Sequence, residues 1–340
     1  MIVLGIESTA HTFGVGIVQD SEPLILADAR TKYVPEKGGI HPREASLHFM
    51  SEGPSTILEA FRQAGITPDE VDAFSVALGP GLGPCLRVGA TFARALSAYY
   101  GKPLVPVNHA VAHVEIGKVL TGAEDPLIVY LSGGNTIIAA YEAGRYRVFG
   151  ETLDIALGNF IDTFVREVGL APPYVVEGKH QLEICAESGK RFVDLPYVVK
   201  GQDVSFSGLL TAALKAYRSG KWGLPDICLS VREVAYSAIV EVAERGLSHT
   251  GKKEILLVGG VAASRVLRDK FEAMAKERGV SVYVVPPKYA VDNGVMIAWT
   301  GLLAFREGVT VKVEEARVNQ RWRLDEVDIP WMSRGGGRDG

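Results

Sequence analysis

The sequence predicts an α/β fold made of two similar domains, each with a mixed sheet flanked by helices. A pattern of strand, tight turn, two further strands and a helix opens the chain and recurs from residue 126. Hairpins occur in any α/β protein, but the matched order favours a duplicated architecture. Strands and helices alternate again beyond residue 254, and a length of 340 residues favours two domains over a single core.

Short apolar runs bounded by turn residues define the elements of the first half. Strands are expected at 2–7, 13–18 and 24–29, with a polar turn at 8–12. A helix is expected at 42–64, a strand at 73–78 and, after the glycine-rich turn 79–84, a helix at 85–100. A strand at 104–107 then leads into a helix that Asn108 would cap.

The second half repeats this beginning, with strands at 127–131, 136–140 and 146–149. Apolar residues at helical spacing predict a helical insertion over about 177–250. Strands at 254–258 and 282–285 and helices at about 265–276 and 291–305 follow. We expect a first domain at 1–123 to which 308–330 returns, a second domain at 124–307, and a disordered tail at 331–340.

The composition is that of an ordinary folded protein and argues against several classes. The chain contains no apolar run of eighteen residues and no signal peptide at its N-terminus, so we expect a cytoplasmic protein without membrane contact. Cys85, Cys185 and Cys228 are odd in number and far apart, which fits a reducing compartment and no thiolate metal cluster. The net charge of −4 gives no general attraction to nucleic acid.

Two histidines, His109 and His113, lie one helical turn apart in the segment 108–113. Side chains at i and i+4 leave the same face of a helix, so both imidazoles can bind one divalent metal. In a metalloprotease helix a glutamate follows the first histidine as general base, and here Ala110 takes that position. Such spacing also arises by chance, so the pair alone leaves a structural role open.

Asp292 precedes an apolar helical segment, and it has two possible roles. It can cap the helix, or it can complete the histidine pair as an oxygen ligand. Two histidines and one carboxylate suit Zn²⁺ and Fe²⁺ alike.

Three turns could bind a phosphate or a nucleotide, at 132–135, 259–264 and 7–9. The first two follow apolar strands and contain small residues, which allow backbone N–H groups to approach an anion. None of the three is a Walker P-loop. Asp162 is either a carboxylate on a helix surface or an acceptor for ribose hydroxyls.

Seven motifs in order resemble one family, the tRNA N6-adenosine threonylcarbamoyltransferases, formerly called O-sialoglycoprotein endopeptidases. The details resemble its archaeal branch, the catalytic subunit of the KEOPS complex. The resemblance covers about residues 1–330 and implies the duplicated fold of actin, sugar kinases and heat-shock ATPases. The motifs are GIHPREA at 39–45, GPGLGPCLR at 79–87, NHAVAH at 108–113, YLSGGNT at 130–136, SFSGL at 205–209, GGVAA at 259–263 and DNGVMIA at 292–298.

The resemblance implies transfer of a threonylcarbamoyl group from threonylcarbamoyl-AMP to N6 of adenosine 37 in tRNAs that read codons starting with A, with release of AMP. The metal, Fe²⁺ or Zn²⁺, would be held by the catalytic residues His109, His113 and Asp292, with Tyr130 beside it. An adenine nucleotide (threonylcarbamoyl-AMP, ATP or an analogue) would contact Tyr130, Leu131, Ser132, Gly133, Gly134, Asp162, Gly178, Gly259, Gly260 and Ser264.

The implied partners are tRNA, an adenylate-forming enzyme that supplies the substrate, and the other KEOPS subunits. These subunits are a separate small protein kinase, a dimerising subunit and a kinase-binding subunit. Arg317, Arg321 and Arg323 form a small basic cluster, which is more typical of solvated surface than of an RNA site. We therefore expect partner subunits to supply much of the tRNA-binding surface.

The sequence departs from the family pattern in three places. Residues 172–179 replace a Pro-Gly-Gly-Pro stretch, so that only Gly178 is carried over and the alignment of the following acid with Glu183 is loose. Ser264 replaces an asparagine, and Leu210 replaces a lysine. The alternatives are a zinc metallopeptidase, which Ala110 argues against, a non-catalytic nucleotide-binding scaffold and a small-molecule kinase.

Overall fold

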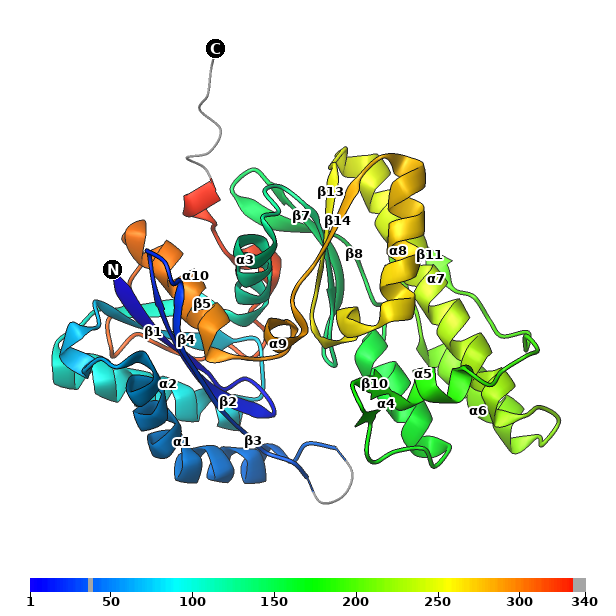
Figure 1. The fold of residues 1–340 in the computed structure, drawn as a ribbon, viewed down its shortest axis with the longest axis horizontal. Helices are drawn as coiled ribbons and strands as arrows, with labels where there is room; N and C mark the ends of the chain where they lie inside the picture. The colour runs from blue at the N-terminus through cyan, green and yellow to red at the C-terminus, as the bar shows by residue number, and fades with distance from the viewer. Residues whose placement is uncertain (36–38, 333–340) are drawn as a thin grey trace, which may run out of the picture. The chain divides into compact units, whose positions relative to one another are not determined.

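The computed structural model describes residues 1–35 and 39–332 of the chain (Figure 1). The chain divides into two compact units, each with its own hydrophobic core. Unit 1 contains Met1–Val119, Glu142–Tyr146 and the chain from Val291 onward, and unit 2 contains Leu120–Tyr141 and Arg147–Ala290.

Unit 1 is built on a five-stranded mixed sheet in the order β3-β2-β1-β4-β5. The first three strands pair antiparallel, and β4 and β5 join parallel to β1. The bounds are β1 Ile2–Glu7, β2 Thr12–Gln19, β3 Ile25–Lys32, β4 Ala73–Gly79 and β5 Leu104–Asn108. The helices are α1 Pro42–Ala64, α2 Gly83–Tyr100, α3 His109–Thr121 and α10 Gly294–Arg306.

The two faces of this sheet carry different side chains. Leu4, Ile6 and Phe13 point into the core that the sheet shares with α1 and α2. On the opposite face, Gly5, Gly14 and Gly16 lie under α10. A Cβ on Gly5 would meet the backbone nitrogen of Ala298 at 2.1 Å. Because these positions lack side chains, α10 lies directly on the strand backbones.

We expect Gly5→Ala to lower the free energy of unfolding by about 3 kcal/mol, at the upper end of the range for overpacking. The added methyl group meets backbone atoms of α10, which cannot rotate away as a side chain can. Chemical denaturation followed by circular dichroism measures the change. The control is Gly39→Ala, because its Cβ has nothing within 4 Å and should change stability by less than about 1 kcal/mol. A Gly5→Ala protein as stable as the control would contradict this packing.

Unit 2 is built on a second five-stranded sheet in the order β14-β13-β6-β7-β8. Strand β13 is parallel to β6 and β14, and β7 is antiparallel to β6. The bounds are β6 Leu127–Leu131, β7 Thr136–Glu142, β8 Arg145–Glu151, β13 Glu254–Val258 and β14 Ser281–Val284. The first residues of β8 and Glu142 of β7 are counted with unit 1.

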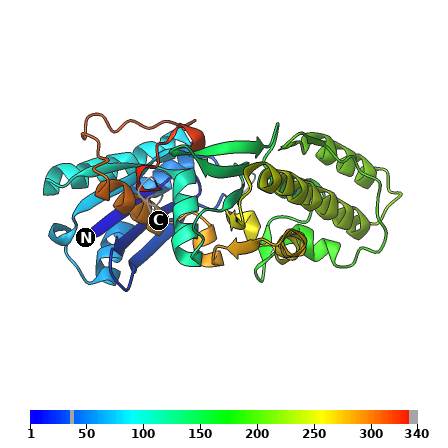
Figure 2. The same cartoon turned by 90° about the horizontal axis from the view of Figure 1, so that it is seen from above.

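Helices and two short hairpins complete unit 2. The 27-residue helix α7 packs beside α6 and α8 (Figure 2). The helices are α4 Leu157–Glu167, α5 Gln181–Ala186, α6 Ser207–Arg218, α7 Leu224–Thr250, η2 Gly260–Ala263, α8 Arg265–Arg278 and α9 Pro287–Ala290. The hairpins are β9 Val175–Val176 with β10 Lys179–His180, and β11 Val199–Lys200 with β12 Asp203–Val204.

The organisation differs from the expectation in its boundaries. The sequence placed the segment up to 307 in the second domain, whereas α10 belongs to unit 1 because it packs on the glycines of β1 and β2. The expected insertion at about 177–250 contains α5, α6 and α7, together with strands too short to be read from the sequence. Of the expected tail, Trp331 and Met332 end the 3₁₀ helix η4 Pro330–Met332, and 333–340 lie outside the described residues.

The cysteines also differ from the expectation of a fully reduced chain. Cys185 of α5 and Cys228 of α7 form a disulfide across 43 residues, with their Cα atoms 5.9 Å apart. Cys85 is free and buried. The pairing depends on how α5 packs on α7, which spacing along the chain does not reveal. None of the helices in the described ranges has the length and apolar character that a bilayer crossing requires.

Candidate metal centre and nucleotide turns

The two histidines open helix α3 directly after strand β5. Asn108 caps the helix as expected, because its Oδ1 accepts hydrogen bonds from the backbone N–H groups of Ala110 (2.9 Å) and Val111 (3.2 Å). Both histidines are buried, and their ring centroids lie 4.7 Å apart. The end of β5 therefore fixes the position of His109, and the helical spacing brings the imidazole of His113 next to it.

Asp292 reaches this pair from the other end of the chain. Its Oδ1 lies 3.3 Å from Nε2 of His113 and 3.6 Å from Nε2 of His109. The N-cap of α10 is Asn293, whose side chain accepts from the backbone of Met296 at 2.8 Å. The capping role that competed for Asp292 is thus filled by its neighbour, and the Asp292 carboxylate faces the histidines.

The geometry of these three residues fits a divalent metal. One ligand atom from each lies within 4.8 Å of the others. A tetrahedral site with metal–ligand bonds of about 2.0–2.1 Å separates its donor atoms by about 3.4 Å, close to the 3.3 and 3.6 Å measured here. Two nitrogens and one oxygen leave further coordination positions open, as catalytic sites require.

A fully buried carboxylate, Glu7, stands behind His109 at the end of β1. Its Oε2 lies 2.9 Å from Nδ1 of His109, while its Oε1 accepts from the backbone N–H of Thr9 at 2.6 Å and from the Thr9 hydroxyl. Metal-binding histidines commonly donate their second N–H to a carboxylate, which fixes the tautomer and the ring orientation. Here this contact turns Nε2 of His109 towards Asp292.

The turn at 7–9 differs from the expectation of a possible anion-binding turn. The carboxylate in this turn is already bonded to His109 and Thr9, and its negative charge would repel a phosphate. The sequence offered no local signal for the contact, because Glu7 and His109 are 102 residues apart.

The charges in this cluster depend on one another. Burial lowers the pKa of His109, but the carboxylates of Glu7 and Asp292 outweigh burial and raise it to about 9. Burial also lowers the pKa of His113, and there it prevails over Asp292. Burial opposes ionisation of Asp292, yet the histidines hold its pKa below the usual range. Without metal, His109 therefore carries a proton at neutral pH that a metal must displace.

The turns 132–135 and 259–264 meet at one edge of the sheet in unit 2. They follow the parallel strands β6 and β13, and a Cβ on Gly259 would meet the backbone oxygen of Leu131 at 2.2 Å. Gly133 and Gly134 are exposed, with nothing within 4 Å of an added Cβ. Ligands of open α/β sheets bind outside the carboxyl ends of their strands, so this edge is the candidate nucleotide site.

The acidic residues expected at this site are held by side chains that the sequence did not reveal. Nε2 of His180 lies 2.9 Å from Oδ1 of Asp162. Glu183 is buried, and its Oε1 accepts from the hydroxyls of Ser264 and, at 3.3 Å, of Tyr236. Glu183, only loosely aligned from sequence, is thus firmly bonded to Ser264.

The remaining expected residues have mixed surroundings. Gly178 lies in the β9–β10 turn with a φ of 79°, and a Cβ added there would have nothing within 4 Å. Leu131 buries its side chain in the core. Tyr130 belongs to unit 2 and is buried, and its hydroxyl accepts from Nδ2 of Asn135 at 3.5 Å. Its expected place beside the metal stays a prediction.

Comparison with known proteins decides the family. The sequence pattern of the tRNA N6-adenosine threonylcarbamoyltransferases matches residues 25–299. The chain belongs to this family. Among its relatives, the tRNA N6-adenosine threonylcarbamoyltransferase of Hyperthermus butylicus is 60% identical over 97% of this chain and 91% of its own length. That of Staphylothermus marinus is 59% identical over 97% of this chain and 99% of its own. The family prediction is confirmed.

Solved structures confirm the predicted fold of this threonylcarbamoyltransferase family member. T. kodakarensis HypF superposes with a TM-score of 0.63 at 16% identity, covering 93% of this chain and 49% of HypF. Component A of the Acidaminococcus fermentans (R)-2-hydroxyglutaryl-CoA dehydratase superposes with a TM-score of 0.54 at 14% identity, covering 88% of this chain and 97% of that protein. At such low identity these neighbours show the fold alone.

Proposed function

We propose that this chain transfers a threonylcarbamoyl group from threonylcarbamoyl-AMP to N6 of adenosine 37 in tRNA, with release of AMP. The proposal is supported above all by the His109–His113–Asp292 cluster in a chain about 60% identical to proteins with this name. Two further features contribute to the proposal. Glu7 contacts His109 of the cluster, and the glycine turns of unit 2 form the candidate nucleotide site.

The proposed metal is Fe²⁺ or Zn²⁺, held by His109, His113 and Asp292. When bound, it would act as a Lewis acid that polarises and orients the acyl group. Glu7 would keep His109 in the coordinating tautomer by accepting a hydrogen bond from its Nδ1–H. Because a mixed anhydride is already activated, the chain needs no strong nucleophile. Ala110, where a metalloprotease has its glutamate, leaves no hydrolytic base after His109, which argues against a peptidase.

The glycine turns of unit 2 are proposed to hold the adenylate. Exposed backbone N–H groups at Gly133 and Gly134 would bind its phosphate. Asp162, oriented by His180, would accept the ribose hydroxyls, and the turn at Gly259 and Gly260 would border the adenine. The backbone N–H dipoles of these turns are already oriented in the folded protein, so they would stabilise the phosphate of the departing AMP without any rearrangement of the chain.

The partners are proposed on the same basis. Transfer to tRNA needs a basic surface, and the chain carries a net charge of −4. Within the small cluster Arg317, Arg321 and Arg323, the last is paired with Asp325 at 3.0 Å. We therefore propose that KEOPS-type subunits contribute most of the tRNA contacts.

The test is reconstitution from purified components. The protein and its partners are incubated with unmodified tRNA, threonine, bicarbonate, ATP and the adenylate-forming enzyme, and nucleosides are quantified by mass spectrometry. We expect threonylcarbamoyladenosine only when this chain is present. Product formed equally without it would overturn its role in the reaction. Full activity of the His109→Ala and Asp292→Ala variants would favour a scaffold, and metal-dependent cleavage of peptides by the pure protein would revive the peptidase.

A further inference from the structure

Helix α5 connects the disulfide of unit 2 with the side chains of the proposed nucleotide site. His180 is its N-cap, Glu183 lies in its first turn, and Cys185 lies in its last turn. The helix has only six residues, which is too short to keep its place through its own hydrogen bonds. Its position must therefore come from its attachments.

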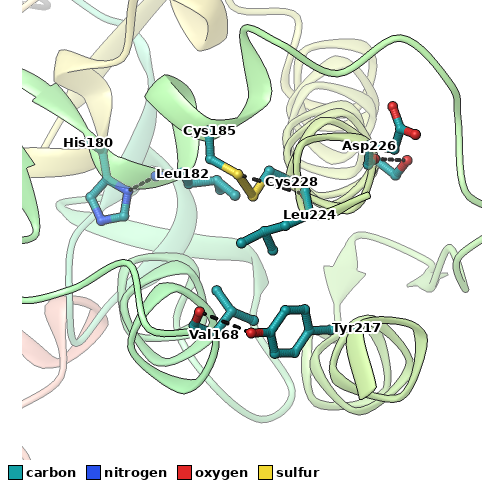
Figure 3. Close-up of a disulfide and its surroundings, with 9 residues drawn as sticks. Val168, His180, Leu182, Cys185, Tyr217, Leu224, Asp226 and Cys228 are labelled. Atoms are coloured by element: carbon teal, nitrogen blue, oxygen red, sulfur yellow. Dashed lines mark hydrogen bonds between the residues drawn. A yellow bond between two sulfur atoms is a disulfide. The ribbon is translucent and has the colours of Figure 1, made fainter. Parts of the chain in front are cut away.

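The first attachment sets the orientation of Asp162. Nδ1 of His180 accepts a hydrogen bond from the backbone N–H of Leu182 at 3.1 Å (Figure 3). Nε2 therefore carries the proton of the neutral ring, and it donates to Oδ1 of Asp162 on α4 at 2.9 Å. A displacement of the start of α5 would move the donor that aims this carboxylate.

The second attachment runs through Glu183. The hydroxyls of Ser264 and Tyr236 donate to the same oxygen of this buried carboxylate. Ser264 also caps α8, where its Oγ accepts from the backbone of Leu267 at 3.2 Å. One side chain of α5 thereby joins the turn after β13 to helix α7.

The third attachment is covalent. Figure 3 shows the disulfide joining α5 to the first turns of α7, with Leu182 beside it. Cys228 is fully buried, whereas Cys185 is partly accessible to solvent. Beyond α5, Asp226 accepts from the backbone N–H groups of Lys190 (2.8 Å) and Arg191 (3.0 Å). The segment after α5 is thus linked to α7 by hydrogen bonds of its own. Helix α5 itself is linked to α7 covalently, through the disulfide.

We propose that the Cys185–Cys228 disulfide positions α5 so that His180 and Glu183 orient the nucleotide-binding side chains, and that its reduction weakens nucleotide binding. This inference rests on the nucleotide site proposed above. A dithiol reductant would transfer two electrons and two protons, giving two cysteine thiols and the oxidised reductant. The hydrogen bonds of Asp226 survive reduction, so the unit stays folded while α5 gains freedom.

The test measures AMP affinity by calorimetry with the full-length protein, oxidised and after treatment with dithiothreitol. We expect the Kd for AMP to rise about three- to tenfold on reduction, as for the loss of a hydrogen-bonding partner, and to recover on reoxidation. Hydrogen exchange followed by mass spectrometry should show faster exchange at 180–186 in the reduced protein, with unchanged exchange in β6 and β13.

Two variants separate the disulfide from other thiol effects. The double variant Cys185→Ala with Cys228→Ala should bind AMP as weakly as the reduced protein and should not respond to dithiothreitol. Cys85→Ser, which removes the free buried cysteine, should keep the full redox response. Equal AMP affinity in both redox states, or equal exchange at 180–186, would overturn the positioning role alone. Failure of the oxidised protein to bind AMP would overturn the nucleotide site itself.

Discussion

The His113→Ala protein should bind no stoichiometric metal and should lose at least about 100-fold of its transferase activity. Nε2 of His113 lies 3.3 Å from Asp292, at the centre of the candidate metal cluster. Lewis-acid stabilisation supplies several kcal/mol to a transition state, and each 1.36 kcal/mol is a factor of ten in rate. Elemental analysis of the purified protein and the reconstituted tRNA assay measure the two effects separately.

The matched control is His249→Ala, because this histidine is exposed on α7. It should keep both the metal and the activity. If the His113→Ala protein modified tRNA at the rate of the control, the metal centre would have no part in the reaction. Retention of bound metal by His113→Ala would instead place the ion elsewhere.

The second large effect is expected from Glu7→Gln, which should weaken metal binding by about 10- to 100-fold near pH 9. The amide keeps the size of the side chain but removes the negative charge that favours a cation on His109. Glu59→Gln makes the same change in an exposed ion pair with Arg62 on α1 and should leave affinity unchanged. Titration against a competing chelator measures both variants.

The pH dependence of this effect has a defined sign. Against burial, Glu7 and Asp292 together raise the pKa of His109 to about 9, so below that pH a metal competes with a proton that Glu7 also stabilises. Metal affinity of the wild-type protein should therefore increase with pH up to about 9. Removing Glu7 weakens proton binding too, so the difference between wild type and Glu7→Gln should be largest near pH 9 and smaller at neutral pH. A difference that shrinks as the pH rises would contradict the direct contact.

The parts predicted from the sequence are those with local signals. Helix geometry places side chains at i and i+4, such as those of His109 and His113, on one face. Small residues after β6 and β13 indicate backbone that approaches a ligand or another segment closely. The ligand role of Asp292 was implied by the family resemblance, because the local sequence left a helix cap equally open; in the structure Asn293 fills that cap. The positions of most strands along the chain could be predicted because buried strands require runs of apolar residues.

The missed parts depend on contacts between distant segments. Glu7 reads as the end of a strand, and only the registers of β1 against β4 and of β4 against β5 bring it to His109. His180 directly follows the stretch that departs from the family pattern, and its partner Asp162 is 18 residues away on helix α4. The place of α10 was encoded in Gly5, Gly14 and Gly16, but the sequence does not say which helix they admit.

Because Asp292 directly precedes α10, the packing of α10 on β1 and β2 also determines when the metal centre can form during synthesis. Asp292 is 179 residues beyond His113, so the histidines leave the ribosome long before their third ligand. At about 5–20 residues per second, this interval lasts roughly 10–40 s, during which the glycine face of the first strands has no cover. The nascent chain would thus carry an incomplete, weakly binding site, and stable metal uptake would be among its last maturation events.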